Sequence, residues 1–179
     1  MPKRTSLSHP LQIDAMPCGA GLVGMTLCPG KRGESNFGDA WERNLELDMR
    51  VIVDWGATTL ASLMEAHEFP MLNVPGLGDA VEQAGLEWHH IPIPDVDVPD
   101  DRFEPLWAYT GHVLRRKLRS GEKIVLHCRG GLGRTGMIAA RLAIEFGVVP
   151  EEALRRVREG RRRTVETRAR KRTCSDSAP

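Results

Sequence analysis

Hydrophobic and polar positions alternate along this chain with two periods, which predicts strands interleaved with helices. Short apolar runs predict buried strands, and apolar positions three and four residues apart predict helices. The predicted strands cover residues 11–14, 22–26, 50–54, 86–91 and 123–127. The predicted helices cover residues 36–49, 58–67, 79–84, 101–119, 134–146 and 151–159. This order indicates an α/β fold, a single domain in which helices flank a central, mainly parallel sheet.

Local start and stop signals support several of these elements. Asp101 and Glu104 have the spacing of a capping box at the start of helix 101–119. Gly147 and Gly160 follow two predicted helices, and Pro150 precedes the second of them. Parallel sheets bind ligands at the carboxyl ends of their strands. Strand 123–127 is the strongest strand signal, so its end is where we expect a site.

Composition limits the class of protein. A chain of 179 residues suits one domain. With 41% hydrophobic and 27% charged residues, it is not a wholly disordered chain. No segment approaches the ~20 apolar residues of a membrane span, and no apolar run follows the basic start. Four cysteines are too few for a disulfide scaffold. We therefore expect a cytoplasmic protein with reduced thiols and no membrane partner.

The net charge of +1 conceals an asymmetry between the two ends of the chain. Residues 151–179 contain ten basic and five acidic side chains, whereas the other residues are acidic on balance. A basic segment can bind nucleic acid, but runs of charge are usually solvated surface. We expect a flexible leader at 1–10, the domain at 11–160 and a basic, partly disordered tail at 161–179, with no nucleic-acid partner.

The candidate chemistry lies where strand 123–127 passes through a glycine-rich turn into helix 134–146. A strand, a turn and a helix N-terminus in this order direct backbone N–H groups and the positive end of the helix dipole at one point. Such a nest binds a tetrahedral oxyanion. The residues expected to hold the phosphate are Arg129, Gly130, Gly131, Leu132, Gly133 and Arg134.

Four side chains of this segment have distinct expected roles. Cys128 lies at the mouth of the nest, where the pKa of a thiol can fall to roughly 3.5–7.5, so it is the candidate nucleophile. Arg134 can hold two phosphate oxygens with its planar fork. Thr135 can donate its hydroxyl to the thiolate, and His127 is expected to orient the loop.

The remaining cysteines and histidines have a structural interpretation. A buried cysteine is usually a small apolar residue, and Cys18, Cys28 and Cys174 are interpreted in this way. Cys18 or Cys28 stays open as the disulfide partner of an oxidised nucleophile. His89 and His90 are adjacent on a predicted strand and point to opposite faces, so we predict no metal site.

The segment from His127 to Thr135 resembles the signature of the cysteine-dependent protein phosphatases. Its Gly-Gly-Leu-Gly-Arg form is most similar to the kinase-associated phosphatase group of dual-specificity phosphatases. Residues 27–30, 88–95 and 98–100 are also similar to that group, so the resemblance covers about residues 20–160.

This resemblance implies the fold, the reaction and the partners. The fold would be protein-tyrosine-phosphatase-like. The reaction would be hydrolysis of phosphotyrosine, phosphoserine and phosphothreonine in proteins through a cysteinyl-phosphate, without a metal or an organic cofactor. The partner would be a phosphoprotein, and we expect a monomer. The resemblance does not identify the physiological substrate.

The resemblance also assigns the general acid. Asp95 matches the family's aspartate after Pro-Ile-x, and Asp97, two residues on, is the rival. Asp100 and Asp101 are better explained as helix caps. The acid would protonate the leaving oxygen and then activate water.

Three further features of the sequence bear on function. Arg170 stands where the family has a water-positioning glutamine. The chain lacks a segment similar to the phosphotyrosine-recognition loop of the larger tyrosine-specific enzymes, which favours dual specificity. Leu132 provides no second cation in the middle of the loop, which disfavours a polyphosphorylated substrate. A non-catalytic phosphate-binding module and a rhodanese-type sulfurtransferase are the alternatives.

Overall fold

The computed structural model describes residues 3–35, 38–95, 97–165 and 172. The strands are β1 (Arg4–Thr5), β2 (Asp14–Cys18), β3 (Gly21–Leu27), β4 (Arg32–Gly33), β5 (Trp41–Glu42), β6 (Ala57–Ser62), β7 (Glu87–His90) and β8 (Lys123–Cys128). The helices are α1 (Leu45–Asp54), α2 (Glu68–Met71), α3 (Leu77–Gln83), α4 (Phe103–Arg119), α5 (Gly133–Glu145) and α6 (Pro150–Gly160).

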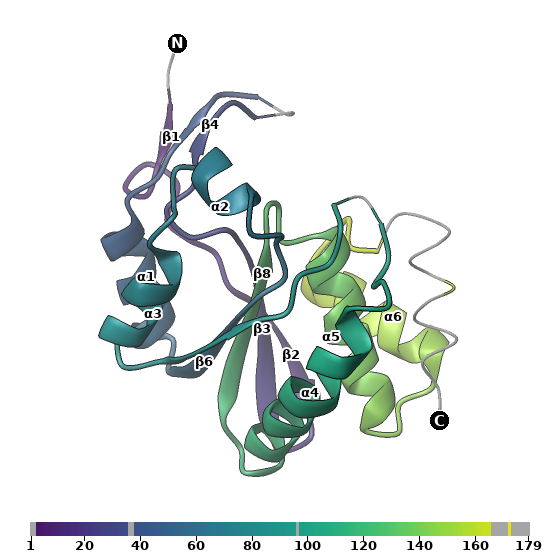
Figure 1. The fold of residues 1–179 in the computed structure, drawn as a ribbon. Coiled ribbons are helices and arrows are strands. Elements are labelled where there is room, and N and C mark those ends of the chain that lie inside the picture. The colour runs from purple at the N-terminus through teal and green to yellow at the C-terminus, as the bar shows by residue number, and fades with distance from the viewer. Residues whose placement is uncertain (1–2, 36–37, 96, 166–171, 173–179) are drawn as a thin grey trace.

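A five-stranded sheet in the order β2-β3-β8-β6-β7 forms the centre of the domain. Only the β2–β3 pair is antiparallel, so the predicted α/β fold with a mainly parallel sheet is confirmed. Helices α1 and α3 lie on one side of this sheet, and α4, α5 and α6 lie on the other (Figure 1). Strand β8 is buried from Ile124 to Cys128, with Ile124, Val125 and Leu126 fully inaccessible.

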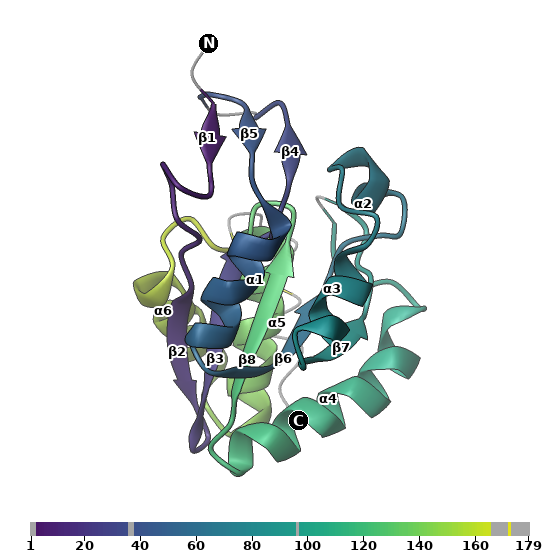
Figure 2. The same ribbon diagram turned by 90° about the vertical axis from the view of Figure 1, so that its left-hand side faces the viewer.

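A second, small sheet was not predicted from the sequence. It has the strand order β1-β5-β4, and its β1 lies within the segment that we expected to be a flexible leader. Figure 2 shows it beyond the end toward which β8 points. It therefore stands over the edge of the main sheet where the glycine-rich turn begins.

The prediction for residues 50–62 was wrong, and of the expected helix 36–49 only residues 45–49 are helical in the described part of the chain. The expected strand 50–54 is the second half of α1, and the expected helix 58–67 contains strand β6. In α1, Asp48, Met49 and Ile52 are buried while Val53 is exposed, which is helical spacing. Asn44 caps the helix by accepting a hydrogen bond from the Leu47 amide at 2.9 Å. This cap and the buried face outweigh the β-branched run, which is only a weak propensity.

The capping box predicted at Asp101 was also wrong. Helix α4 begins at Phe103, and the residue before it, Arg102, makes no side-chain cap. Instead, the Asp100 carboxylate accepts a hydrogen bond from the Arg102 amide at 3.0 Å. The local turn starts one residue earlier than the sequence spacing suggested.

None of the helices in the described part of the chain is long and apolar enough to cross a membrane.

Candidate active site

Strand β8 ends at Cys128, and the glycine-rich turn leads directly into α5. Gly131 has φ +68°, and a Cβ there would lie 2.2 Å from the Thr26 carbonyl oxygen, so only glycine fits. The Gly131 amide donates to Cys128 Sγ at 3.2 Å. The turn therefore directs the Gly131 amide at the sulfur.

The Cys128 thiol is 3% exposed, and its surroundings favour the thiolate. Burial raises the pKa of Cys128, but the Arg134 charge and hydrogen bonds from Thr135 and Gly131 outweigh it and lower the pKa below 9.0. Thr135 Oγ1 is buried without a partner of ordinary geometry among the described residues. The Cys128 thiolate is the group that this hydroxyl stabilises, which lowers the pKa of Cys128.

A buried carboxylate that the sequence analysis missed holds Arg134 in place. Glu68 of α2 accepts from Arg134 Nη1 at 2.5 Å and from Nη2 at 2.9 Å, and both side chains are 1% exposed. The Ile93 carbonyl also accepts from Nη1 at 3.1 Å. Burial lowers the pKa of Arg134, but the bonds to Glu68 raise it more, so the guanidinium stays charged.

Asp95 lies next to this guanidinium. Its Oδ1 is 3.0 Å from Arg134 Nη2, and its side chain is 44% exposed. Asp95 lines the same cavity as Cys128, whereas Asp97 is absent from the cavity's described lining and accepts from the Val98 amide. This arrangement supports the choice of Asp95 over Asp97 as the acid.

His127, the residue before the candidate nucleophile, is fully buried. Its Nε2 lies 2.6 Å from Ser62 Oγ, and that hydroxyl accepts from Trp88 Nε1 at 2.9 Å. Burial lowers the pKa of His127 to about 3, and the Arg134 charge acts in the same direction. A neutral imidazole tied to β6 and β7 fits the expected role of orienting the loop.

Arg161 holds the loop from behind. Its Nε donates to the Gly131 carbonyl at 2.6 Å and its Nη2 to the Gly130 carbonyl at 3.2 Å. Its Nη1 pairs with Asp14 of β2 at 2.6 Å. We had assigned Arg161 to the basic tail, but the structure attaches it to the phosphate-binding loop.

The cavity at this site has a volume of about 260 Å³. One wall is formed by the loop, with Arg134 and Asp95. The other is formed by Lys31, Arg32 and Trp41, which belong to or adjoin the small sheet. No sequence pattern indicated this second wall, because it depends on a chain reversal far from residues 127–136.

The two candidate redox partners of Cys128 differ in position. Cys18 pairs with Gly21 at the far end of the sheet, where β8 begins, and burial raises its pKa to about 12. Cys28 follows Leu27, the residue that pairs with Cys128, and burial raises its pKa further. The geometry disfavours Cys18. Arg170 and Cys174 lie outside the described residues.

The two adjacent histidines have different hydrogen-bond partners. His89 Nε2 lies 2.8 Å from Glu87 Oε1, and His90 Nε2 lies 2.7 Å from the Met64 carbonyl. Their rings therefore do not converge on one point.

Comparisons with known proteins extend over most of the chain. Residues 39–147 match the family described as polymorphic toxin system, DSP-PTPase phosphatase. Cyclin-dependent kinase inhibitor 3 of Rattus norvegicus is 29% identical over 158 residues, which cover 85% of this chain and 71% of that protein. A crystal structure of kinase associated phosphatase, with its catalytic-site cysteine replaced by serine, has a TM-score of 0.81 at 24% identity and covers 93% of both chains. Tk-PTP in its active form has a TM-score of 0.66 at 25% identity and covers 87% of this chain and 90% of that chain.

Proposed function

The chain belongs to the DSP-PTPase phosphatase family of polymorphic toxin systems and is a protein tyrosine/dual-specificity phosphatase, and on this basis we propose how it acts. It hydrolyses phosphotyrosine, phosphoserine and phosphothreonine in proteins through a cysteinyl-phosphate. The observation that carries this proposal is the convergence of Cys128, Arg134 and Asp95 on one cavity at the end of β8.

In the first step, the Cys128 thiolate attacks phosphorus while Arg134 and the loop amides hold the nonbridging oxygens. The sulfur–phosphorus bond forms, the phosphorus–oxygen bond to the leaving group breaks, and Asp95 gives its proton to the leaving oxygen. Phosphate oxygens would need the same Arg134 Nη2 that Asp95 Oδ1 contacts at 3.0 Å. Substrate binding therefore displaces Asp95 from Arg134, which frees its carboxyl to reach the leaving oxygen.

In the second step, Asp95 takes a proton from water, and the water oxygen attacks phosphorus. The sulfur–phosphorus bond breaks and the thiolate returns. Donation from the buried Thr135 hydroxyl stabilises the departing sulfur. The neutral His127 takes no proton in either step.

Dual specificity is supported by the sequence, which has no segment similar to the phosphotyrosine-recognition loop of the tyrosine-specific enzymes. The protein-phosphatase relatives support a phosphoprotein as the substrate.

The test is hydrolysis of para-nitrophenyl phosphate with EDTA present, followed by phosphotyrosine, phosphoserine and phosphothreonine peptides. Wild type should be active, Cys128→Ser inactive, and Cys18→Ser, a matched cysteine at the far end of the sheet, active. Mass spectrometry of rapidly quenched enzyme should find one phosphoryl group on the peptide that contains Cys128. Turnover by Cys128→Ser would overturn the proposed chemistry.

A further inference from the structure

Lys31 is a buried cation next to the active-site loop that no described carboxylate pairs. Its side chain is 7% exposed, and its Nζ donates to the Arg129 carbonyl at 3.1 Å. The other two buried cations of the described chain, Arg43 and Arg134, each have a bidentate carboxylate partner. Burying an ammonium without a carboxylate counterion costs free energy, which a bound anion would offset. Within the chain, a Cys128 thiolate is an anion whose charge acts on Lys31.

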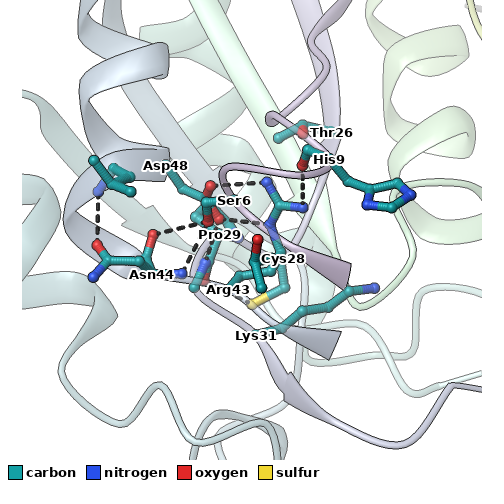
Figure 3. Close-up of polar contacts among 12 residues, drawn as sticks. Ser6, His9, Thr26, Cys28, Pro29, Lys31, Arg43, Asn44 and Asp48 are labelled. Atoms are coloured by element: carbon teal, nitrogen blue, oxygen red, sulfur yellow. Dashed lines mark hydrogen bonds and ion pairs between the residues drawn. The ribbon is translucent and has the colours of Figure 1, made fainter. Parts of the chain in front are cut away.

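The backbone around Lys31 is held firmly. The Gly30 amide donates to Asp48 Oδ2 at 2.8 Å, and the Arg43 amide donates to the Lys31 carbonyl at 3.2 Å. Arg43 binds both oxygens of Asp48 and also the His9 carbonyl. Figure 3 shows the Lys31 amine pointing away from the Arg43–Asp48 pair. The pair therefore fixes the segment while leaving the ammonium for another ligand.

Lys31 also faces the reacting centre. It lines the cavity that contains Cys128, and its Nζ lies 4.5 Å from the centre of the Trp41 ring. Burial lowers the pKa of Lys31 to about 8, while the charge on a Cys128 thiolate acts in the opposite direction. Arg32 and Arg129 line the same cavity, whose described lining also includes the carboxylates of Glu34 and Asp95.

We propose that Lys31, with Arg32 and Arg129, binds a second anionic group of the protein substrate, a carboxylate or phosphate close in sequence to the phosphorylated residue. This inference rests on the proposed function and specifies its substrate class as acidic phosphopeptides. The middle of the loop, at Leu132, has no cation. Lys31 and Arg32, at the small sheet, and Arg129, at the start of the loop, provide positive charge instead. A carboxylate or phosphate at this site would remove the electrostatic cost of Lys31.

The test compares two phosphotyrosine peptides that differ only by Glu or Gln at the flanking positions. The measured quantity is the ratio of their kcat/KM values, so a general loss of activity cancels. Wild type should prefer the Glu peptide by about tenfold, as expected for one partly desolvated charge pair. Lys31→Met should bring the ratio close to one, and Lys31→Arg should restore most of it.

Arg50→Gln is the matched control. Arg50 is an exposed cation on α1, paired with Glu46, and it is not part of the cavity wall. Its removal should leave the ratio unchanged. A ratio that falls equally in both variants would show only a general charge effect and would overturn the inference.

The pH dependence of the wild-type ratio tests the same idea without a substitution. The preference should be lost as pH rises above about 8, because Lys31 then loses its proton. The charged and titratable groups that face Lys31 or line its cavity are Arg4, Cys28, Arg32, Glu34, Arg43, Asp95, Cys128, Arg129 and Arg134. Cys28 stays neutral because burial raises its pKa. Ionisation of Cys128 changes both peptides' rates together and leaves the ratio unchanged.

The outcomes separate the two proposals. If the enzyme hydrolyses para-nitrophenyl phosphate but has equal kcat/KM values for the Glu and Gln peptides, the second anion site is overturned. The proposed phosphatase activity would still stand. No Cys128-dependent hydrolysis of any substrate would overturn the proposed function itself. A further outcome is that the enzyme hydrolyses an inositol polyphosphate faster than the Glu peptide, in a reaction that depends on Lys31. That result would overturn the acidic phosphopeptide as the ligand of the Lys31 site.

Discussion

At the scale of single residues, the reactivity of Cys128 depends on groups that the fold delivers to it. Its burial alone would favour the neutral thiol, and Arg134, Thr135 and Gly131 reverse that preference. His127, the residue before it, is kept neutral by its own burial. Of these two adjacent residues, Cys128 is shifted toward its charged form and His127 toward its neutral form. Each shift can be tested by one substitution.

Thr135→Val should raise the pKa of Cys128 and slow the second step. The substitution keeps the shape of the side chain and removes the hydroxyl that stabilises the thiolate. We expect the ascending limb of the pH profile of kcat/KM to move to higher pH and kcat to fall about tenfold to a hundredfold.

Thr59→Val is the control for this experiment, because Thr59 Oγ1 is likewise buried without a described partner but lies in β6. It should leave the pH profile unchanged. An unmoved profile in Thr135→Val would show that the hydroxyl does not serve the sulfur.

His127 should make the folded state sensitive to acid. Its pKa is about 3 in the folded protein, against an ordinary value of 6.5, so the unfolded chain binds one more proton between these values. The free energy of unfolding therefore decreases as pH falls through this window, by about 1.4 kcal/mol per unit at most. Urea unfolding from pH 7 to pH 4 measures this slope.

In His127→Gln, the slope should be flatter by that amount, even if the variant is less stable at every pH. His112→Gln, on an exposed face of α4, is the control and should keep the wild-type slope. Equal slopes in all three proteins would contradict a buried neutral imidazole.

At the scale of elements, three segments distant in the sequence hold the turn between β8 and α5. Helix α2 provides Glu68 for Arg134, and β6 and β7 hold His127 through Ser62 and Trp88. The residue after α6, Arg161, binds the carbonyls on the back of the turn. Carbonyls that are bound from behind leave the amides of the same turn for an oxyanion.

Arg161→Met should loosen this turn. It removes two charge-assisted hydrogen bonds to the loop and the ion pair to Asp14. We expect KM for para-nitrophenyl phosphate and the inhibition constant of inorganic phosphate to rise about tenfold, while kcat changes less.

Arg162→Met is the matched control, because Arg162 is the exposed neighbour in the same basic run. It should change either constant less than twofold. Equal effects of the two substitutions would mean that the run acts only through its net charge, as we expected of a basic tail.

At the scale of the whole molecule, the cavity is lined by segments that are distant in the sequence and come together only after folding. The loop after β7 brings Asp95, the main sheet brings Cys128, and the small sheet brings the cationic wall. Asp95 contacts Arg134 from a half-exposed position, and the mechanism proposed above requires this contact to break when substrate binds.

Asp95→Ala should separate binding from chemistry. Without the carboxylate on Arg134 Nη2, phosphate binding should tighten and KM should fall. Loss of the acid should lower kcat about a hundredfold for phenyl phosphate and much less for para-nitrophenyl phosphate, whose leaving group needs little protonation. Asp97→Ala should behave like wild type. Equal losses on both substrates would argue against Asp95 as the acid.

The strands and helices that were predicted correctly from the sequence are those with strong local signals. Strand β8, α5 and α6 were located because an unbroken apolar run, glycines and a proline mark their ends. The swap of helix and strand over residues 50–62 shows the limit of such signals. Val51, Ile52 and Val53 favour a strand locally, yet α1 buries only the side of them that faces the sheet.

Sequence patterns alone were enough to predict the α/β class and to select Cys128, Arg134 and the turn glycines as candidate site residues, because these depend on periodicity and on residues adjacent in the chain. Only the tertiary structure decided the counterion Glu68, the brace Arg161 and the unpaired cation Lys31. Each of these side chains contacts the active-site loop across a long sequence separation. A local sequence pattern does not predict which distant side chain will contact the loop. The physical reason is that burial of charge has a cost set by the whole surroundings, so the partner of a buried ion is known only once the chain is folded.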